Sequence, residues 1–353
     1  MNNEKFNQTR LIFARKRRKY TIRSLSSALG ITSQTLSNYE NGRSIPDPDM
    51  LSLISKHLHF PEQFFFLDNI EMLDSKSVSF RSLARMPAYV REAALCAGNM
   101  ALEFTNWLEK KIEFPHVDLP DLRDCEPEAA AETLRSIWGL GELSIKNMVH
   151  TLEAKGVRVF SLSENTYDMD AYSFWIGDQP FVFLNTQKSV EHGRFDAAHE
   201  LGHLILHKHG APLGKEAEQQ ANRFASAFLM PYGSIVSHVP HSFFPTIPGI
   251  VSLKPYWRVS TSALTRRLKD LSLLSDWHYN NIIKELSRRG YLKNEPNPIT
   301  DRETSKLLPL VFNELSETGI TKTHIAREIG CFVDDINELI FNLTIPPHLK
   351  IIK

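Results

Sequence analysis

Residues 194–207, RFDAAHELGHLILH, place two histidines four positions apart in a segment that is otherwise rich in apolar side chains. On a helix, positions i and i+4 lie on one face, so His199 and His203 would stack one above the other. Glu200 lies about 100° further round such a helix than His199. Burying these polar side chains is costly unless each has a partner. The pattern therefore predicts a helix whose two histidines bind the same partner.

A divalent metal ion suits this arrangement. Two imidazoles can hold Zn²⁺ at about 2.0–2.1 Å each, and a catalytic zinc keeps a third protein ligand and one open position for water. The neighbouring glutamate could reach that water and act as general base, as in the HExxH motif. We expect Zn²⁺ as the cofactor, His199 and His203 as ligands, and Glu200 as the catalytic base.

The segment KEAEQQANRFASAFLMP (215–231) offers the third ligand. It has the pattern of an amphipathic helix, and Glu218 stands fifteen residues after His203. Glu216 lies about 200° away on the same helix, so the two acids cannot face one ion. One turn after Glu218, Asn222 could orient a ligand histidine through a hydrogen bond.

Alternatives to this metal site stay open. His207 and His209 could compete as ligands, although positive character near a helix C-terminus favours them as caps. The triad could also be a buried polar network, which is stable only when every group is satisfied. Candidates for a second donor to a developing oxyanion are Tyr172, Tyr232 and His238.

The first sixty residues carry a separate signal in their charge. They contain ten Lys and Arg against four Asp and Glu, a net charge of +6, whereas the whole chain is formally neutral. A basic region on a neutral chain is typical of a domain that meets a polyanion. The run ARKRRKY (14–20) would direct charge toward phosphates without specifying sequence.

TIRSLSSALGITSQTLSNYENGRSIPD (21–47) has the layout of a helix-turn-helix. We expect the first helix at about 22–29, a turn at Gly30, and a second helix capped by Thr32 or Ser33. The start of the second helix would enter the major groove of double-stranded operator DNA. The side chains expected to contact that DNA are Arg23, Ser33, Gln34, Thr35, Ser37, Asn38 and Arg43. The alternative is a basic helical domain that binds protein or dimerises.

Three runs are rich in β-branched and aromatic residues, namely GVRVFSL (156–162), DAYSFWI (170–176) and PFVFLN (180–185). The tripeptide GDQ suits a hairpin between the last two. If 180–185 is a sheet edge, an extended substrate could pair with it; it could equally be ordinary core.

Two stretches resemble known families. SQTLSNYENGRSIPD is similar to the recognition helix and following loop of Cro/C1-type (XRE) repressor domains, although Arg23 stands where that family often has a bracing Gln. RFDAAHELGHLILH followed by EQQANRFASAFLMP resembles the ImmA/IrrE family of zinc metallopeptidases, with similarity from roughly 140 to 295. In that family a zinc-dependent peptidase cleaves a DNA-binding repressor or regulator, which relieves repression.

The second resemblance implies roles for individual residues. His199 and His203 match the histidine ligands, Glu200 the base, and Glu218 the third ligand through E-x-Q-A-N. It implies a DNA-binding transcriptional regulator with zinc endopeptidase activity toward a repressor or regulatory protein. The alternatives are a non-proteolytic repressor with a peptidase-like sensor or dimerisation module, and a toxin–antitoxin or phage-immunity partner that acts by binding.

The expected fold is mainly α with a small β-sheet, in 353 residues that suffice for two or three domains. The expected segments are a helix-turn-helix domain (1–70), a helical linker (71–126), an α+β zincin-like metallopeptidase domain (127–250), its helical extension (251–298) and a small C-terminal helical domain (299–353).

Cellular context and assembly complete the expectations. Three scattered cysteines support neither a disulfide framework nor a cysteine metal site. The polar N-terminus and the lack of a 20-residue apolar run suggest a cytoplasmic protein that does not enter membranes. The helical pattern 87–113 carries an apolar stripe that could form a homodimer contact or pack internally: Val90, Ala94, Met100, Leu102 and Leu108.

Overall fold

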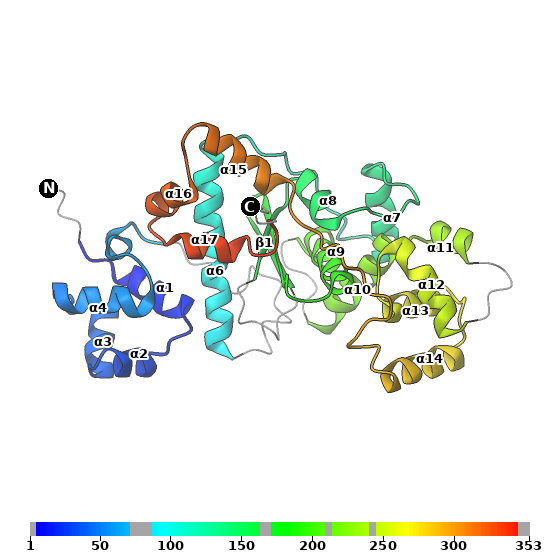
Figure 1. Ribbon diagram of the computed structural model, residues 1–353, viewed down its shortest axis with the longest axis horizontal. Helices are drawn as coiled ribbons and strands as arrows, with labels where there is room; N and C mark the ends of the chain where they lie inside the picture. Colours follow the sequence, from blue (N-terminus) through cyan, green and yellow to red (C-terminus); the bar gives the residue numbers. More distant parts are fainter. Residues whose placement is uncertain (1–4, 71–86, 163–170, 209–213, 240–244, 345–353) are drawn as a thin grey trace, which may run out of the picture. The chain divides into compact units, whose positions relative to one another are not determined.

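The structure, a computed structural model, describes residues 5–70, 87–162, 171–208, 214–239 and 245–344 (Figure 1). Its contacts divide the chain into two compact units. The first comprises Met1–Phe114, Phe160–Met169 and Leu307–Thr344, and the second comprises Pro115–Val159, Asp170–Lys306 and Ile345–Lys353. The C-terminal helices thus share a unit with the N-terminal region, and the five segment boundaries expected from sequence stay a prediction.

The described part of the first unit consists mainly of helices, together with the end of strand β1. Its N-terminal part contains α1 (Gln8–Arg17), α2 (Ile22–Ala28), α3 (Ser33–Glu40), α4 (Pro48–Leu58) and the 3-10 helix η1 (Glu62–Phe66). The rest contains α6 (Ala88–Glu109), α15 (Leu307–Glu317), α16 (Lys322–Ile329) and α17 (Val333–Leu339).

Polar caps and a small aromatic core explain why the N-terminal part folds locally. Thr21 caps α2 by accepting from the Ser24 backbone N–H, and Thr32 caps α3 in the same way from Thr35. The buried rings of Phe60 and Phe64 stack with centroids 4.3 Å apart, and both contact Phe13 of α1. Such burial fixes the angles between short helices that would not be stable alone.

Helix α6 packs inside the first unit, against α1 and α16. Of its expected apolar stripe, Ala94, Met100 and Leu108 are buried, and the neighbouring Phe104 stacks on Phe312 of α15. These side chains therefore act in internal packing. A homodimer contact through α6 stays a prediction.

The second unit combines helices with most of a small sheet. Its elements are α7 (Pro127–Ile137), α8 (Met148–Ala154), β1 (Arg158–Ser161, at the boundary between the units), β2 (Ala171–Ile176), β3 (Gln179–Leu184), α9 (Val190–Leu206), α10 (Lys215–Leu229), α11 (Tyr232–His238), α12 (Ile247–Trp257), α13 (Thr261–Asp270) and α14 (Asp276–Arg288). The expected fold class, mainly α with a small sheet, is confirmed.

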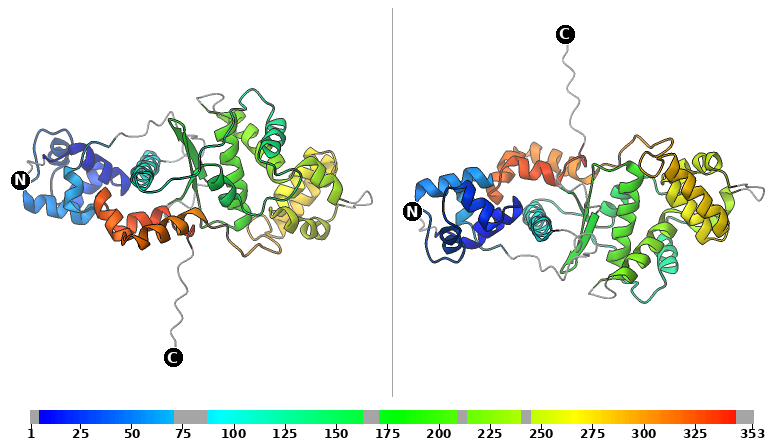
Figure 2. Two further views of the ribbon diagram at one scale, coloured as in Figure 1. Left: turned by 90° about the horizontal axis from the view of Figure 1, so that it is seen from above. Right: turned by 90° about the horizontal axis from the view of Figure 1, so that it is seen from below.

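The sheet has the order β1-β3-β2, so β3 is its middle strand. Strands β2 and β3 form an antiparallel hairpin in which Ala171 pairs with Leu184 and Ile176 with Gln179. The hypothesis that 180–185 is a sheet edge is wrong, because this segment is paired on both sides. The outer strand β2 instead packs against α9, which lies beside the sheet in both views of Figure 2.

No helix among the described residues has both the length and the apolar character that crossing a bilayer requires.

Candidate metal centre and nucleic-acid interface

Helix α9, which carries HExxH, is held firmly in the second unit. Ser189 caps its start by accepting from the His192 backbone N–H at 3.2 Å. Near that end, the buried Arg194 donates to the Trp257 and Ile145 carbonyl oxygens and pairs with Glu303. A rigid helix suits a catalytic site because its side chains keep fixed relative positions.

Helices α9 and α10 pack closely at Gly202. A Cβ at this position would lie 3.0 Å from the Phe224 ring and 3.2 Å from the Ala221 Cα, closer than ordinary packing allows. Small residues at the crossing let the two backbones approach. Consequently Glu218, one turn before Ala221 on α10, reaches the histidines of α9.

The three expected ligands converge. His199 Nε2 and His203 Nε2 lie 3.1 Å apart, and the two carboxylate oxygens of Glu218 lie 3.6 and 3.5 Å from them respectively. One ligand atom from each residue lies within 4.8 Å of the others. Atoms that bind one zinc tetrahedrally at about 2.0–2.1 Å are separated by about 3.3 Å. The observed spacing therefore fits a single ion.

Hydrogen bonds define the tautomer of the first ring. His199 Nδ1 lies 3.1 Å from Asn222 Oδ1, and an amide oxygen only accepts. The ring proton therefore sits on Nδ1, which leaves a lone pair on Nε2. Burial lowers the pKa of His199 to about 4, so the ring is neutral at pH 7, as a metal ligand must be.

The tautomer of the second ring, that of His203, follows from a longer chain of contacts. His207 Nε2 donates to Gln220 Oε1 at 2.9 Å, so His207 Nδ1 is an acceptor. That acceptor lies 2.9 Å from His203 Nδ1, which must donate to it. His203 Nε2 is thus left with a lone pair, just as His199 Nε2 is.

Acceptor groups alone therefore face one another at this point of the fold. Two imidazole lone pairs and a mostly buried carboxylate cannot hydrogen-bond to one another, because all three are acceptors. A cation satisfies all three at once. Two nitrogens and one oxygen are a donor set that zinc takes in catalytic sites, so the residues present fit this ion.

Glu200, which follows His199 on α9, is buried. Only 4% of the residue is exposed, and Ser173 Oγ of β2 donates to its Oε2 at 2.6 Å. Burial raises the pKa of Glu200 to about 7, and the Ser173 hydrogen bond opposes that rise. A carboxyl group with such a pKa can both accept and return a proton near neutrality.

Sequence reasoning missed the supporting groups Ser173 and Gln220 and assigned His207 a different role. The backbone N–H of His207 does donate to the His203 carbonyl oxygen at the end of α9, but its ring also positions His203. His209 lies outside the described residues. No local spacing signals these contacts, because Ser173 and Gln220 belong to other elements.

The candidate oxyanion donors lie in different surroundings. Tyr172 is buried and stacks on Phe183 in the sheet, whereas Tyr232 is exposed at the start of α11. His238 Nδ1 lies 2.8 Å from the Ser234 carbonyl oxygen. A catalytic role for any of them stays a prediction.

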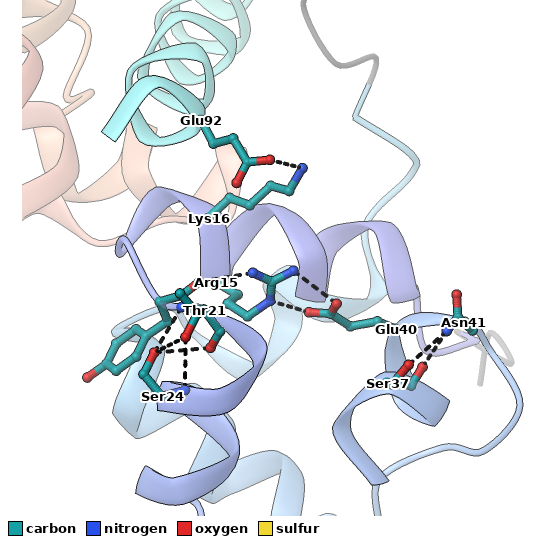
Figure 3. A network of polar contacts seen from close by, with 9 residues as sticks. Arg15, Lys16, Thr21, Ser24, Ser37, Glu40, Asn41 and Glu92 are labelled. Atoms are coloured by element: carbon teal, nitrogen blue, oxygen red, sulfur yellow. Dashed lines mark hydrogen bonds and ion pairs between the residues drawn. The ribbon is translucent and has the colours of Figure 1, made fainter. Parts of the chain in front are cut away.

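In the first unit, α2 and α3 form the expected pair of short helices. Arg23, Ser33, Gln34 and Arg43 are exposed, and the other side chains expected at DNA are half-buried: Thr35, Ser37 and Asn38. Some of these groups already have partners within the motif. Gln34 donates to Asn38 at 3.1 Å, Asn41 donates to the Ser37 carbonyl and hydroxyl oxygens (Figure 3), and the hydroxyls of Ser33 and Ser26 lie 3.0 Å apart.

The basic run 14–20 is used differently from the expectation. Arg15 forms a buried two-point ion pair with Glu40 of α3, and Lys16 contacts Glu92 of α6 at 2.8 Å (Figure 3). The next two cations pair with acids of α17, Arg17 with Glu338 and Arg18 with Asp335. The structure thus pairs these four cations with acids of the same unit, and contact of this run with phosphates stays a prediction.

Comparisons with known proteins agree with both motifs. Residues 11–65 match the family model described as helix-turn-helix, and residues 152–269 match that of the IrrE N-terminal-like domain, a peptidase family that is generally zinc-dependent. No curated protein shows a significant match to the chain. The chain therefore carries an XRE-type helix-turn-helix domain followed by an IrrE-like peptidase-family domain.

Proposed function

We propose that this protein is a DNA-binding transcriptional regulator with a zinc-dependent endopeptidase site, and that it cleaves a repressor or another regulatory protein. One observation carries the catalytic half: the acceptor-only cluster of His199, His203 and Glu218. A purely structural polar network would place donors against acceptors. This cluster places acceptors against acceptors, which favours a bound cation.

The residues of the site have distinct tasks. His199, His203 and Glu218 would hold the ion, while Asn222 and His207 keep the two rings in the metal-binding tautomer. Zinc at this position would lower the pKa of a water molecule and polarise the scissile carbonyl.

Glu200 handles the proton. It accepts a proton as the water oxygen attacks the carbonyl carbon, and it returns that proton to the amine nitrogen as the C–N bond breaks. Its pKa of about 7 suits both directions of transfer. Ser173 keeps the carboxylate oriented through the hydrogen bond to Oε2.

The outer strand β2 is the better candidate for contact with an extended substrate. It carries Ser173, which touches Glu200, whereas β3 is the middle strand. A peptide segment that paired with β2 would add a strand to the sheet and pass close to the base.

The DNA-binding half rests on the helix-turn-helix match and on the exposure of Gln34 and Arg43. Helix α3 would present its first turns to base edges in the major groove of an operator. A protein that combines both activities could remove a regulator at the site where that regulator acts.

Replacement of Glu200 by Gln tests the proposal. The variant should retain zinc, measured by emission spectroscopy, yet lose proteolysis of repressors encoded beside this gene. Wild-type protein that binds no stoichiometric zinc, or a variant that cuts at near wild-type rate, would contradict the proposed mechanism.

A further inference from the structure

One turn before HExxH, α9 buries another carboxylate, that of Asp196. Only 12% of its side chain is exposed, and its Oδ2 has no hydrogen-bond partner within the described part of the chain. A ring nitrogen of His192, Nε2, lies 3.5 Å from Oδ2 and also 3.4 Å from Lys188 Nζ. A carboxylate that is buried without hydrogen bonds costs free energy, so a partner from outside would stabilise it.

Helix geometry places Asp196 beside the proposed catalytic centre. At 100° per residue, Glu200 lies about 40° to one side of Asp196 and His203 about 20° to the other side. The three residues therefore share one face of the helix. At a rise of about 1.5 Å per residue, Asp196 lies about 6 Å before Glu200 along the helix. Asp196 is not one of the three residues whose ligand atoms cluster around one point, but its distance along the helix is the spacing of a neighbouring substrate side chain.

We propose that Asp196 is a specificity residue that binds the ammonium or guanidinium group of a substrate Lys or Arg next to the scissile bond. This inference rests on the proposed function, because it requires a peptide held at the metal cluster. A long basic side chain supplies both the reach and the charge that the carboxylate lacks. The side chain keeps 12% of its surface exposed, whereas its Oδ2 atom is buried.

Two further observations support this assignment. Burial raises the pKa of Asp196 to about 6, and the charges of His192 and Lys188 only partly oppose that rise. A substrate cation would compensate the same penalty. His192 itself is half exposed, so a substrate side chain can displace its ring from the carboxylate at little cost.

Binding of small chelators to the zinc-loaded full-length protein tests this inference without any turnover. Two matched pairs of peptide hydroxamates, one pair for each side of the scissile bond, carry lysine or norleucine next to the chelating group. The two members of a pair differ only in the ammonium group. Asp196 should contact the side chain on only one side of the scissile bond. In the pair for that side, calorimetry should show that the lysine compound binds about tenfold more tightly than the norleucine compound, as expected for a buried charge pair.

The variant Asp196→Asn should abolish this preference and leave the affinity of the norleucine compound unchanged. The matched control is Asp178→Asn, which removes the same charge from a side chain that is 99% exposed and should keep the preference. Thermal unfolding checks that Asp196→Asn is folded, and its Tm should equal or exceed that of the wild type.

The outcomes separate this inference from the proposed function. Equal binding of lysine and norleucine compounds in both pairs, or a preference that survives Asp196→Asn, overturns the role of Asp196 and leaves the zinc site intact. Failure of the protein to hold zinc and of every hydroxamate to bind overturns the proposed function, and this inference with it.

Discussion

The candidate DNA-contacting residues and the candidate metal ligands differ in where their polar groups lie. Gln34 at the start of α3 is exposed, and so is Arg43 in the loop that follows this helix. Between α9 and α10, the lone pairs of two imidazoles instead meet a carboxylate across the helix interface. An outward surface suits a large partner such as DNA, whereas an inward cluster of acceptors has room only for an ion. The difference is consistent with the separate partners that we propose for the two units.

The largest expected effect is the loss of the metal in Glu218→Ala. Removal of a third of the protein ligands should weaken zinc binding by more than about 100-fold, beyond the effect of losing a group that only orients a ligand. Zinc content after dialysis measures this loss. The exposed Glu216→Ala on the same helix is the control, and equal zinc retention in both variants would refute the comparison.

The next effect concerns stability in the first unit. Glu40→Ala leaves the buried Arg15 guanidinium without its carboxylate, and breaking such a pair costs about 3–5 kcal/mol of unfolding free energy. Urea unfolding of the full chain should show this loss in one transition, with zinc content unchanged. The exposed Glu62→Ala should stay within about 0.5 kcal/mol of wild type. A loss below about 1 kcal/mol in Glu40→Ala would mean that the pair does not hold α1 to α3.

A smaller effect is expected at the DNA surface. Gln34→Ala removes an exposed amide from the start of α3 and should weaken operator binding by about 1–3 kcal/mol if it contacts a base. Fluorescence anisotropy with the operator measures the change, and Gln63→Ala, exposed on η1, is the control. Unchanged affinity would remove Gln34 from the interface.

The smallest effect should follow from Gln220→Ala. This amide acts on the metal only through His207 and His203, so we expect zinc affinity to fall about tenfold, at the lower end for groups that orient ligands. Competition with a coloured chelator resolves such a difference. Gln219→Ala, exposed on the same helix, should behave as wild type; an equal loss in both variants would point to a general effect on α10.

Local patterns predicted much of each helix pair. The spacing of HExxH placed both histidines on one face of α9, and Thr32 was identified as one of two possible caps of α3. The fold class followed from the same periodicities. These features depend on neighbours within a few residues, which is the range that sequence patterns describe.

Long-range contacts could not be predicted in this way. Arg17 pairs with Glu338, 321 residues later, and Ser173 reaches Glu200 from a strand that no motif marks. The position of β3 in the middle of the sheet also depends on which strands pair, and the alternating pattern of a strand does not encode that.

Helices α9 and α10 cross closely at Gly202, so the affinity for a zinc ion held by ligands from both helices would depend on the distance between them. Because Glu218 belongs to α10 and both imidazoles to α9, an added methyl group at the crossing would push the ligand sets apart. Conversely, an ion that bridges them resists separation of α9 and α10. Chelation of such an ion should therefore speed amide exchange along α10 before it affects the helix-turn-helix of the other unit, and the supply of metal would then control the stability of the α9–α10 pair.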